Sequence, residues 1–130
     1  MSHVTDVKLE VNDLDALEEA CDELGLELVR DRKTHAWWGT FVGDSKPPDW
    51  LHPKDYGKCE HAIRIKGDSP VMGPGGPWEI GVYKNPNGPG YRLAFDYYGG
   101  AGQRLVKRVG DREASKLKQE YAVSVAKKKI

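Results

Sequence analysis

One turn motif, Asn85-Pro86-Asn87-Gly88, is flanked on both sides by alternating apolar residues. The Asn-Gly pair favours a tight turn because both residues tolerate positive φ. The alternating apolar positions are Trp78, Ile80 and Val82 before the motif, and Tyr91, Leu93, Phe95 and Tyr97 after it. This pattern predicts a β-hairpin over residues 78–98, so the chain must build an antiparallel sheet.

The first 30 residues carry the pattern of a strand, a helix and a second strand. Val7, Leu9 and Val11 alternate with charged residues, as in a half-buried strand. Asn12 and Asp13 are suitable N-caps, and Gly25 suits the end of a helix. The apolar stripe between them has helical spacing and consists of Leu14, Leu17, Cys21 and Leu24. Residues 26–30 then predict a second strand.

The remaining chain is predicted to hold two long loops, two further extended segments and a second helical region. Residues 34–41 and 61–66 are expected to be extended. The loops, 42–58 and 67–77, are rich in proline and glycine, and Trp50 and Leu51 indicate that the first folds back onto the domain. The glycine-rich run 99–102 is expected to break the chain before a helix that Asp111 caps or restarts. The last apolar positions, to Val125, favour a helix, with a strand over 121–125 as the alternative.

Strands that are grouped rather than strictly alternating with helices indicate the α+β class. We expect a single domain, residues 1–130, with an antiparallel sheet of four to six strands and two helices on one face. The most specific expectation is a ferredoxin-like, split β-α-β arrangement.

Charge is distributed unevenly along the chain, although 20 basic and 20 acidic residues balance. Residues 1–60 carry 7 basic and 14 acidic residues, whereas residues 104–130 carry 9 and 3. A basic tail of this kind is typical of nucleic-acid binding, or of two ends that attract each other within one fold or between copies. The preferred interpretation is a solvated helix face that ends in Lys127, Lys128 and Lys129, because basic residues suit a helix C-terminus. The candidate nucleic-acid contacts are Arg104, Lys107, Arg108, Lys127, Lys128 and Lys129.

Cys59 and His61 lie close to His52, Asp49 and Asp55, and these residue types suit zinc. The spacing matches no standard zinc signature, so a hydrogen-bonded core histidine is the preferred interpretation and no metal is predicted. In an extended strand, Cys59 and His61 would project to the same face, where the thiol would be a candidate nucleophile. Cys21 is predicted to be a core residue, and both thiols are expected to be reduced.

Aromatic residues gather at strand ends next to the glycine-rich loops, where planar rings are able to stack on a base or nucleotide. Filling of the core is the competing interpretation. The run Gly99-Gly100-Ala101-Gly102 is a weak match to a phosphate-binding turn. Together with Cys59 and His61, the candidate ligand contacts are His35, Trp37, Trp38, Tyr56, Trp78, Tyr97 and Tyr98.

Several segments resemble a family of small uncharacterised proteins from cyanobacteria, algal chloroplasts and bacteriophages, a domain of unknown function. The similar segments are Met1-Ser2-His3, the helix from Asp13 to Ala20, Tyr56 to Arg64, Trp78 to Val82, Tyr91 to Tyr98, and Tyr121-Ala122. The resemblance implies a soluble protein, with bacteriophages among the sources of the family. The reduced thiols favour the cytoplasm, which is the host cytoplasm if the protein is phage-encoded. In those relatives the last helix leads to a strand-rich tail, so a sheet edge is expected to be unfilled here and to invite a partner or a second copy.

These observations favour a small, non-enzymatic accessory protein that acts through a protein partner or by self-association, without a cofactor. A nucleotide- or nucleic-acid-binding protein is the alternative, and a metal- or thiol-dependent enzyme around Cys59 and His61 is a third hypothesis. No apolar run approaches the roughly 20 residues of a membrane helix, so no membrane partner is expected.

Overall fold

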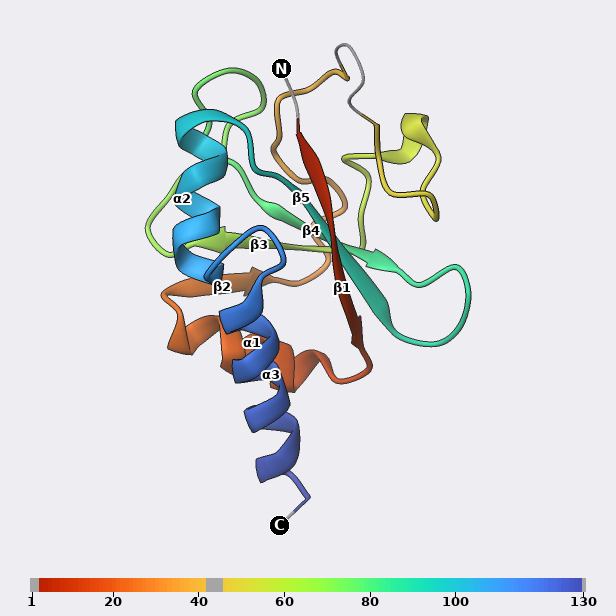
Figure 1. Cartoon of the computed structure of the whole chain (residues 1–130), viewed down its shortest axis with the longest axis vertical. Helices are drawn as coiled ribbons and strands as arrows, with labels where there is room; N and C mark the ends of the chain where they lie inside the picture. Colours follow the sequence, from red (N-terminus) through yellow and green to blue (C-terminus); the bar gives the residue numbers. More distant parts are fainter. Residues whose placement is uncertain (1–2, 42–45, 130) are drawn as a thin grey trace.

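The computed structural model describes residues 3–41 and 46–129, which form a five-stranded antiparallel sheet and three α-helices (Figure 1). The strands cross the sheet in the order β1-β5-β4-β3-β2. Their bounds are β1 (Val4–Val11), β2 (Leu26–Val29), β3 (His61–Ile65), β4 (Ile80–Lys84) and β5 (Tyr91–Asp96). The α+β class and the predicted strand count are therefore confirmed.

Strands β4 and β5 form the predicted hairpin. Val82 pairs with Leu93, and the backbone N–H of Asn85 donates to the carbonyl oxygen of Gly90 at 3.0 Å. The side-chain oxygen of Asn85 also accepts from the N–H of Asn87 at 3.0 Å, which is the local bond that favours asparagine in turns. Trp78, Ile80 and Val82 all enter the same core, as their spacing predicted.

Helix α1 (Leu14–Glu23) begins and ends as predicted. Asp13 caps it by accepting from the N–H of Ala16 at 3.0 Å, and Gly25 adopts the left-handed conformation (φ 71°) just beyond its end. The helix connects β1 to β2, and these strands form opposite edges of the sheet. A split β-α-β unit has one strand between its two parallel strands, whereas three lie between these two, so the ferredoxin-like arrangement is not confirmed.

Two helices, rather than one, follow the hairpin: α2 (Gly99–Val109) and α3 (Ser115–Lys127). Gly110 (φ 107°) ends α2, and Asp111 stabilises the turn before α3 by accepting from the N–H groups of Glu113 and of Ser115, the first residue of α3. The run 99–102 does not break the chain, because it is the first turn of α2. Residues 121–125 belong to α3, so the alternative of a C-terminal strand is wrong.

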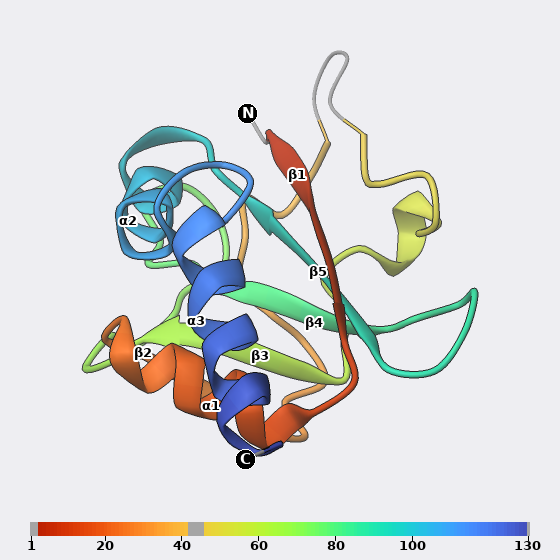
Figure 2. The same cartoon turned by 60° about the horizontal axis from the view of Figure 1, so that its bottom comes forward.

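All three helices cover one face of the sheet (Figure 2). Leu17 of α1, Leu105 of α2 and Leu117 of α3 are fully buried in one core with the strand residues Val7 and Leu93. In the described part of the chain, no helix has the length and apolar character required to cross a membrane.

The opposite face is covered by the segment between β2 and β3. The predicted strand over 34–41 is not formed, since only Thr34 makes an isolated bridge, to Lys58. Part of the predicted loop 42–58, residues 42–45, lies outside the described residues, and the remainder includes the short helix η1 (Pro53–Asp55). A second hydrophobic cluster lies on this face, and its buried members are Trp37, Tyr56, Cys59, Tyr83 and Ala94. Trp50 and Leu51 pack against this second cluster, so the loop folds back onto the domain as predicted.

Candidate functional site

The outer edge of β1, the side that faces away from β5, is the best candidate for a functional surface. In the described sheet no strand pairs with this side. The N–H of Tyr97 donates to the carbonyl oxygen of His3 at 2.8 Å, in register with the pairs of Thr5 with Phe95 and Val7 with Leu93. Because bonding direction alternates along an antiparallel strand, the backbone groups of Val4 and Asp6 point outward.

A hollow lies on each side of this outer edge. The larger, of about 700 Å³, lies between β1 and the turn that joins α2 to α3, and its lining includes Lys8, Arg112 and Lys118. The hydroxyl of Thr5 donates to the carbonyl oxygen of Arg112 at 3.1 Å, which ties this turn to the strand. The smaller, of about 390 Å³, lies between β1 and residues 46–49. Val4, Asp6 and Tyr97 line both hollows, so the outward backbone groups lie between them.

Charged side chains of alternating sign follow one another along β1: Asp6, Lys8 and Glu10. Asp6 forms an ion pair with Arg92 at 3.0 Å, and the Arg92 guanidinium lies 5.0 Å from the centre of the Trp50 ring. Lys8 and Glu10 are exposed, and no ion pair is formed by either side chain with the described residues. The outer edge therefore presents a negative, a positive and a negative side chain in that order along the strand.

The predicted aromatic candidates are brought together, but mostly as packing. His35, Trp37, Tyr56 and Trp78 are at most 5% exposed, whereas Trp38, Tyr97 and Tyr98 are half-buried. The Trp37 and Tyr56 rings meet edge to face at 4.5 Å, and the Trp38 and Tyr98 rings do so at 5.9 Å. A base has no access to the buried rings unless the covering segment moves, so the arrangement matches the core-filling interpretation.

His35 is held in its neutral form. The hydroxyl of Tyr83 accepts from the N–H of Gly57 at 2.8 Å and also bonds to Nε2 of His35. Nδ1 of His35 faces the carbonyl oxygen of Ala36, which favours a proton on Nδ1 and leaves Nε2 to accept from the Tyr83 hydroxyl. Complete burial, with a smaller contribution from the nearby charge of Arg32, lowers the pKa of His35 to about 4. The histidine therefore fixes the covering segment to β4 and carries no charge at neutral pH.

Two buried carboxylates, Glu79 and Asp96, were missed by the sequence analysis. Glu79 accepts from the N–H of Ala36 at 2.9 Å, and its other oxygen lies 2.8 Å from Nε of Arg32. Asp96 accepts from three backbone N–H groups, those of His3, Trp38 and Tyr98, and burial raises its pKa. Both anchor the segment that covers the sheet. In the sequence, both residues alternate with the apolar residues of the hairpin, so they resemble residues that face solvent. The only indication that this face is covered is the aromatic segment between β2 and β3.

Cys59 and His61 do not form a joint site. Cys59 packs in the second cluster, whereas His61 pairs with Val82, whose side chain lies on the helix-covered face. The prediction of a shared face is wrong because β3 begins at His61 and Cys59 precedes it in an irregular segment.

The Cys59 thiol donates to the carbonyl oxygen of Arg32, and burial raises its pKa to about 12, which disfavours a thiolate. His61 Nδ1 accepts from the N–H of Asp31 at 2.9 Å, as expected of a hydrogen-bonded core histidine. Over residues 3–41 and 46–129, no group of three or more His, Cys, Asp and Glu side chains is arranged to hold a metal ion.

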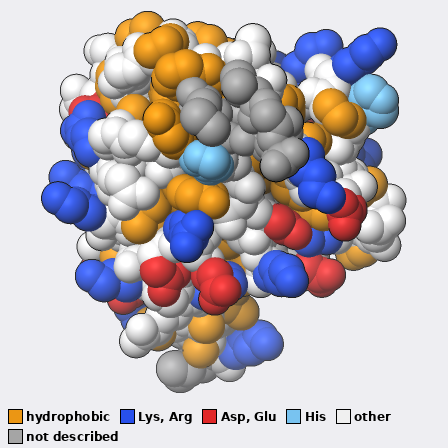
Figure 3. Space-filling model, turned by 45° about the horizontal axis from the view of Figure 1, so that its top comes forward, with side chains coloured by type: hydrophobic (Ala, Val, Ile, Leu, Met, Phe, Trp, Pro, Cys, Tyr) orange, Lys and Arg blue, Asp and Glu red, His pale blue; other side chains and the backbone are white. Residues whose placement is uncertain are grey.

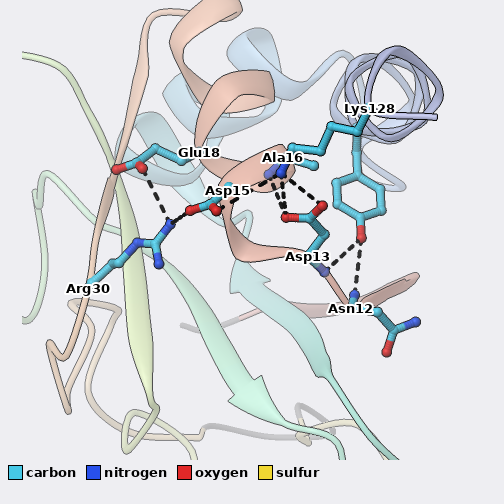
Figure 4. Close-up of polar contacts among 8 residues, drawn as sticks. Asn12, Asp13, Asp15, Ala16, Glu18, Arg30 and Lys128 are labelled. Carbon is cyan, nitrogen blue, oxygen red and sulfur yellow. Dashed lines mark hydrogen bonds and ion pairs between the residues drawn. The ribbon is translucent and has the colours of Figure 1, made fainter. Parts of the chain in front are cut away.

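Among the residues that the structure describes, three of the six nucleic-acid candidates in the basic C-terminal region pair with acidic residues of the same chain. Lys128 donates to both carboxylate oxygens of Asp13, at 3.0 and 2.9 Å (Figure 4). Lys127 lies 3.8 Å from Glu19, and Arg104 lies 3.0 Å from Asp68. The other nucleic-acid candidates, Lys107, Arg108 and Lys129, are exposed.

Part of the uneven charge is therefore balanced where the two ends of the chain meet within one fold. Acidic α1 packs against basic α3, Lys127 of α3 pairs with Glu19 of α1, and Lys128 pairs with Asp13 just before α1. On the face drawn in Figure 3, acidic and basic side chains are intermixed and do not form a surface of one sign. Nucleic-acid binding normally depends on a continuous basic surface, so this face gives that alternative little support.

Comparison of the chain with protein-family models, with curated proteins and with solved structures gives no match. The resemblance noted in the sequence stays a prediction.

Proposed function

We propose that this chain is a small, non-enzymatic interaction protein that binds another polypeptide by adding a strand to the outer edge of β1. The observation that carries the proposal is the pair of hollows on either side of the outward backbone groups of Val4 and Asp6. An added strand bonds to such groups through its own backbone, and its side chains point alternately to the two sides. The two hollows give both sets of side chains a place to lie.

The charges on β1 supply selectivity. Edge strands with charged side chains resist indiscriminate pairing, because an unsuitable strand places like charges opposite each other or buries one unpaired. Asp6, Lys8 and Glu10 therefore favour a strand with the complementary order of charges. The proposed compartment is the cytoplasm, which is supported by two free, buried cysteines, Cys21 and Cys59.

A matched pair of variants at Lys8 tests the proposal. Its backbone follows the inward-facing Val7, so its N–H is expected to point outward, and proline removes that donor. Lys8→Ala removes the same side chain but keeps the N–H. Both variants are to be compared by circular dichroism and thermal unfolding, to establish that the fold is retained.

The wild-type chain and both variants are then immobilised and exposed to an extract of the producing cells, and retained proteins are quantified by mass spectrometry. Self-association is measured in parallel by analytical ultracentrifugation. We expect a partner, or a second copy, that wild type and Lys8→Ala retain and Lys8→Pro loses. If the two variants behave alike in both measurements, the outer edge of β1 is not the binding surface and the proposal is wrong.

A further inference from the structure

We infer that the strand that fits the outer edge of β1 is β1 of a second copy of this chain, paired antiparallel with Val7 opposite Val7. The inference rests on the proposed function and names its partner. It joins two sheets into one continuous sheet through a two-fold axis perpendicular to them, so that the helices of both copies lie on the same side.

The backbone geometry of β1 suits this pairing. Asp6 presents its N–H and C=O outward, and Lys8 is expected to do the same, because these positions flank the inward-facing Val7. With Val7 on the axis, Asp6 of each copy lies opposite Lys8 of the other. Each such pair exchanges two backbone hydrogen bonds, so the two symmetric pairs add four bonds to the sheet.

The side-chain charges select this register. Asp6 and Lys8 share one face of the strand, so pairing about Val7 places a carboxylate beside an ammonium group twice. Pairing about Lys8 places the two lysines together and Asp6 beside Glu10, and pairing about Asp6 places two aspartates together. Pairing about Leu9 also joins opposite charges, Lys8 with Glu10, but both of those residues lie within 8–10, where the register between β1 and β5 is irregular. Pairing about Val7 instead uses Asp6, which lies in the regular part of β1.

The hollows and the overall charge also suit a second copy. In this register Leu9, which is half-buried, lies opposite Thr5 of the other copy, on the side of the larger hollow. Lys8 lines the larger hollow, and in this register it lies opposite Asp6 of the other copy, which lines both hollows. Because the chain carries 20 basic and 20 acidic residues, two copies meet without net repulsion.

Charge reversal at the two positions gives a sharp test. Lys8→Glu places a second carboxylate beside Asp6 in both pairs, and Asp6→Lys places two ammonium groups together, so each variant alone is expected to be monomeric at concentrations where wild type is a dimer. An equimolar mixture restores both opposite-charge pairs and is expected to form a heterodimer. Native mass spectrometry distinguishes the heterodimer from the two homodimers by mass. Lys54→Glu, an exposed reversal on η1, serves as the control and is expected to leave the wild-type dimer intact.

Amide hydrogen exchange provides a second measurement, because Asp6→Lys also removes the ion pair with Arg92 and has the greater risk of misfolding. In the wild-type chain, the N–H groups of Asp6 and Lys8 are expected to become protected as concentration rises. Addition of salt is expected to weaken the dimer, since the two ion pairs are at the surface.

The possible outcomes separate three claims: that the chain dimerises, that β1 binds another polypeptide, and that the pairing is centred on Val7. A wild-type chain that stays monomeric, with unprotected Asp6 and Lys8 amides at all concentrations, overturns the inference. If that monomer still retains a partner that Lys8→Pro loses, the proposed function stands and only the second copy is wrong. A dimer that Lys8→Glu leaves intact, or a mixture that forms no heterodimer from two folded variants, overturns the Val7 register.

Discussion

The hydroxyl of Tyr121 on α3 lies 3.0 Å from the backbone nitrogen of Asn12, at the junction of β1 and α1. It also accepts from the N–H of Asp13 at 3.2 Å. A single tyrosine thus satisfies two N–H groups where the chain leaves the edge strand and enters the helix, and it ties the end of the chain to its beginning. The ion pair between Lys128 and Asp13 lies beside it, two turns further along the chain.

Tyr121→Phe is expected to lower the free energy of unfolding by about 1–2 kcal/mol, because two N–H groups lose their acceptor while the ring still packs. Denaturant unfolding followed by circular dichroism measures the change. Tyr98→Phe is the matched control, since its half-buried side chain makes no hydrogen bond through its hydroxyl with the described residues. Equal stability of the two variants would show that the Tyr121 bonds contribute little.

Two glycines of α2 are expected to respond to alanine in opposite directions. A Cβ at Gly102 would lie 2.1 Å from the backbone carbon of Tyr97, whereas a Cβ at Gly100 meets nothing within 4 Å among the described residues. Gly102→Ala is therefore expected to destabilise the fold by about 3 kcal/mol, because backbone atoms must move. Gly100→Ala is expected to stabilise it by about 0.5 kcal/mol through helix propensity. Thermal unfolding of both variants checks the signs, and a neutral Gly102→Ala would contradict the close packing of α2 on Tyr97.

Acid is expected to destabilise the protein partly through His35. Its pKa falls from 6.5 to about 4 on folding, so between these pH values the unfolded chain binds more protons than the folded one. Stability from this group is complete above about pH 6.5 and declines towards pH 4, by about 3 kcal/mol in total. His35→Gln keeps an acceptor for the Tyr83 hydroxyl but does not titrate, so its unfolding free energy should depend less steeply on pH in this range. Parallel pH profiles for wild type and His35→Gln would exclude the effect.

Both cysteines are expected to resist thiol reagents in the folded protein. Burial raises the pKa of Cys21 and of Cys59 to about 12, so few thiolates are present at pH 8. Reaction with an aromatic disulfide reagent, followed by absorbance, should be slow under native conditions and complete for two thiols in denaturant. Rapid labelling of Cys59 in the folded chain would revive the thiol-dependent hypothesis, and Cys21→Ser would assign the labelled residue.

The elements that local patterns specify were predicted well. The hairpin over 78–98 and the capped helix after Asp13 follow from turn chemistry, caps and periodicity, which act over a few residues. The glycine run 99–102 was misjudged because glycine usually disfavours a helix. Here the close approach of Gly102 to Tyr97 requires the absence of a side chain, and that approach is a tertiary contact.

The candidate site shows the same division. The alternation of apolar and charged residues along β1 was predicted from the sequence, but the residues first selected for binding do not form the site. His35, Trp37 and Tyr56 are aromatic because they cover a sheet face, and their burial depends on a segment that no periodic pattern describes. The two hollows beside Asp6 are lined by residues about 40 and 100 positions further along the chain, such as Pro47 and Arg112.

The sequence by itself determined the α+β class, the hairpin, the first helix and the opposite charges of the two ends, because each depends on neighbouring residues or on composition. Only the tertiary structure decided that β1 and β2 are the two edges, that Lys127 at the end of α3 pairs with Glu19 of α1, and that Glu79 and Asp96 are buried. Strand order and burial depend on how distant segments compete to cover apolar surface and to satisfy backbone hydrogen bonds. That competition acts on the whole chain at once, and it is what left the outer edge of β1 between two hollows.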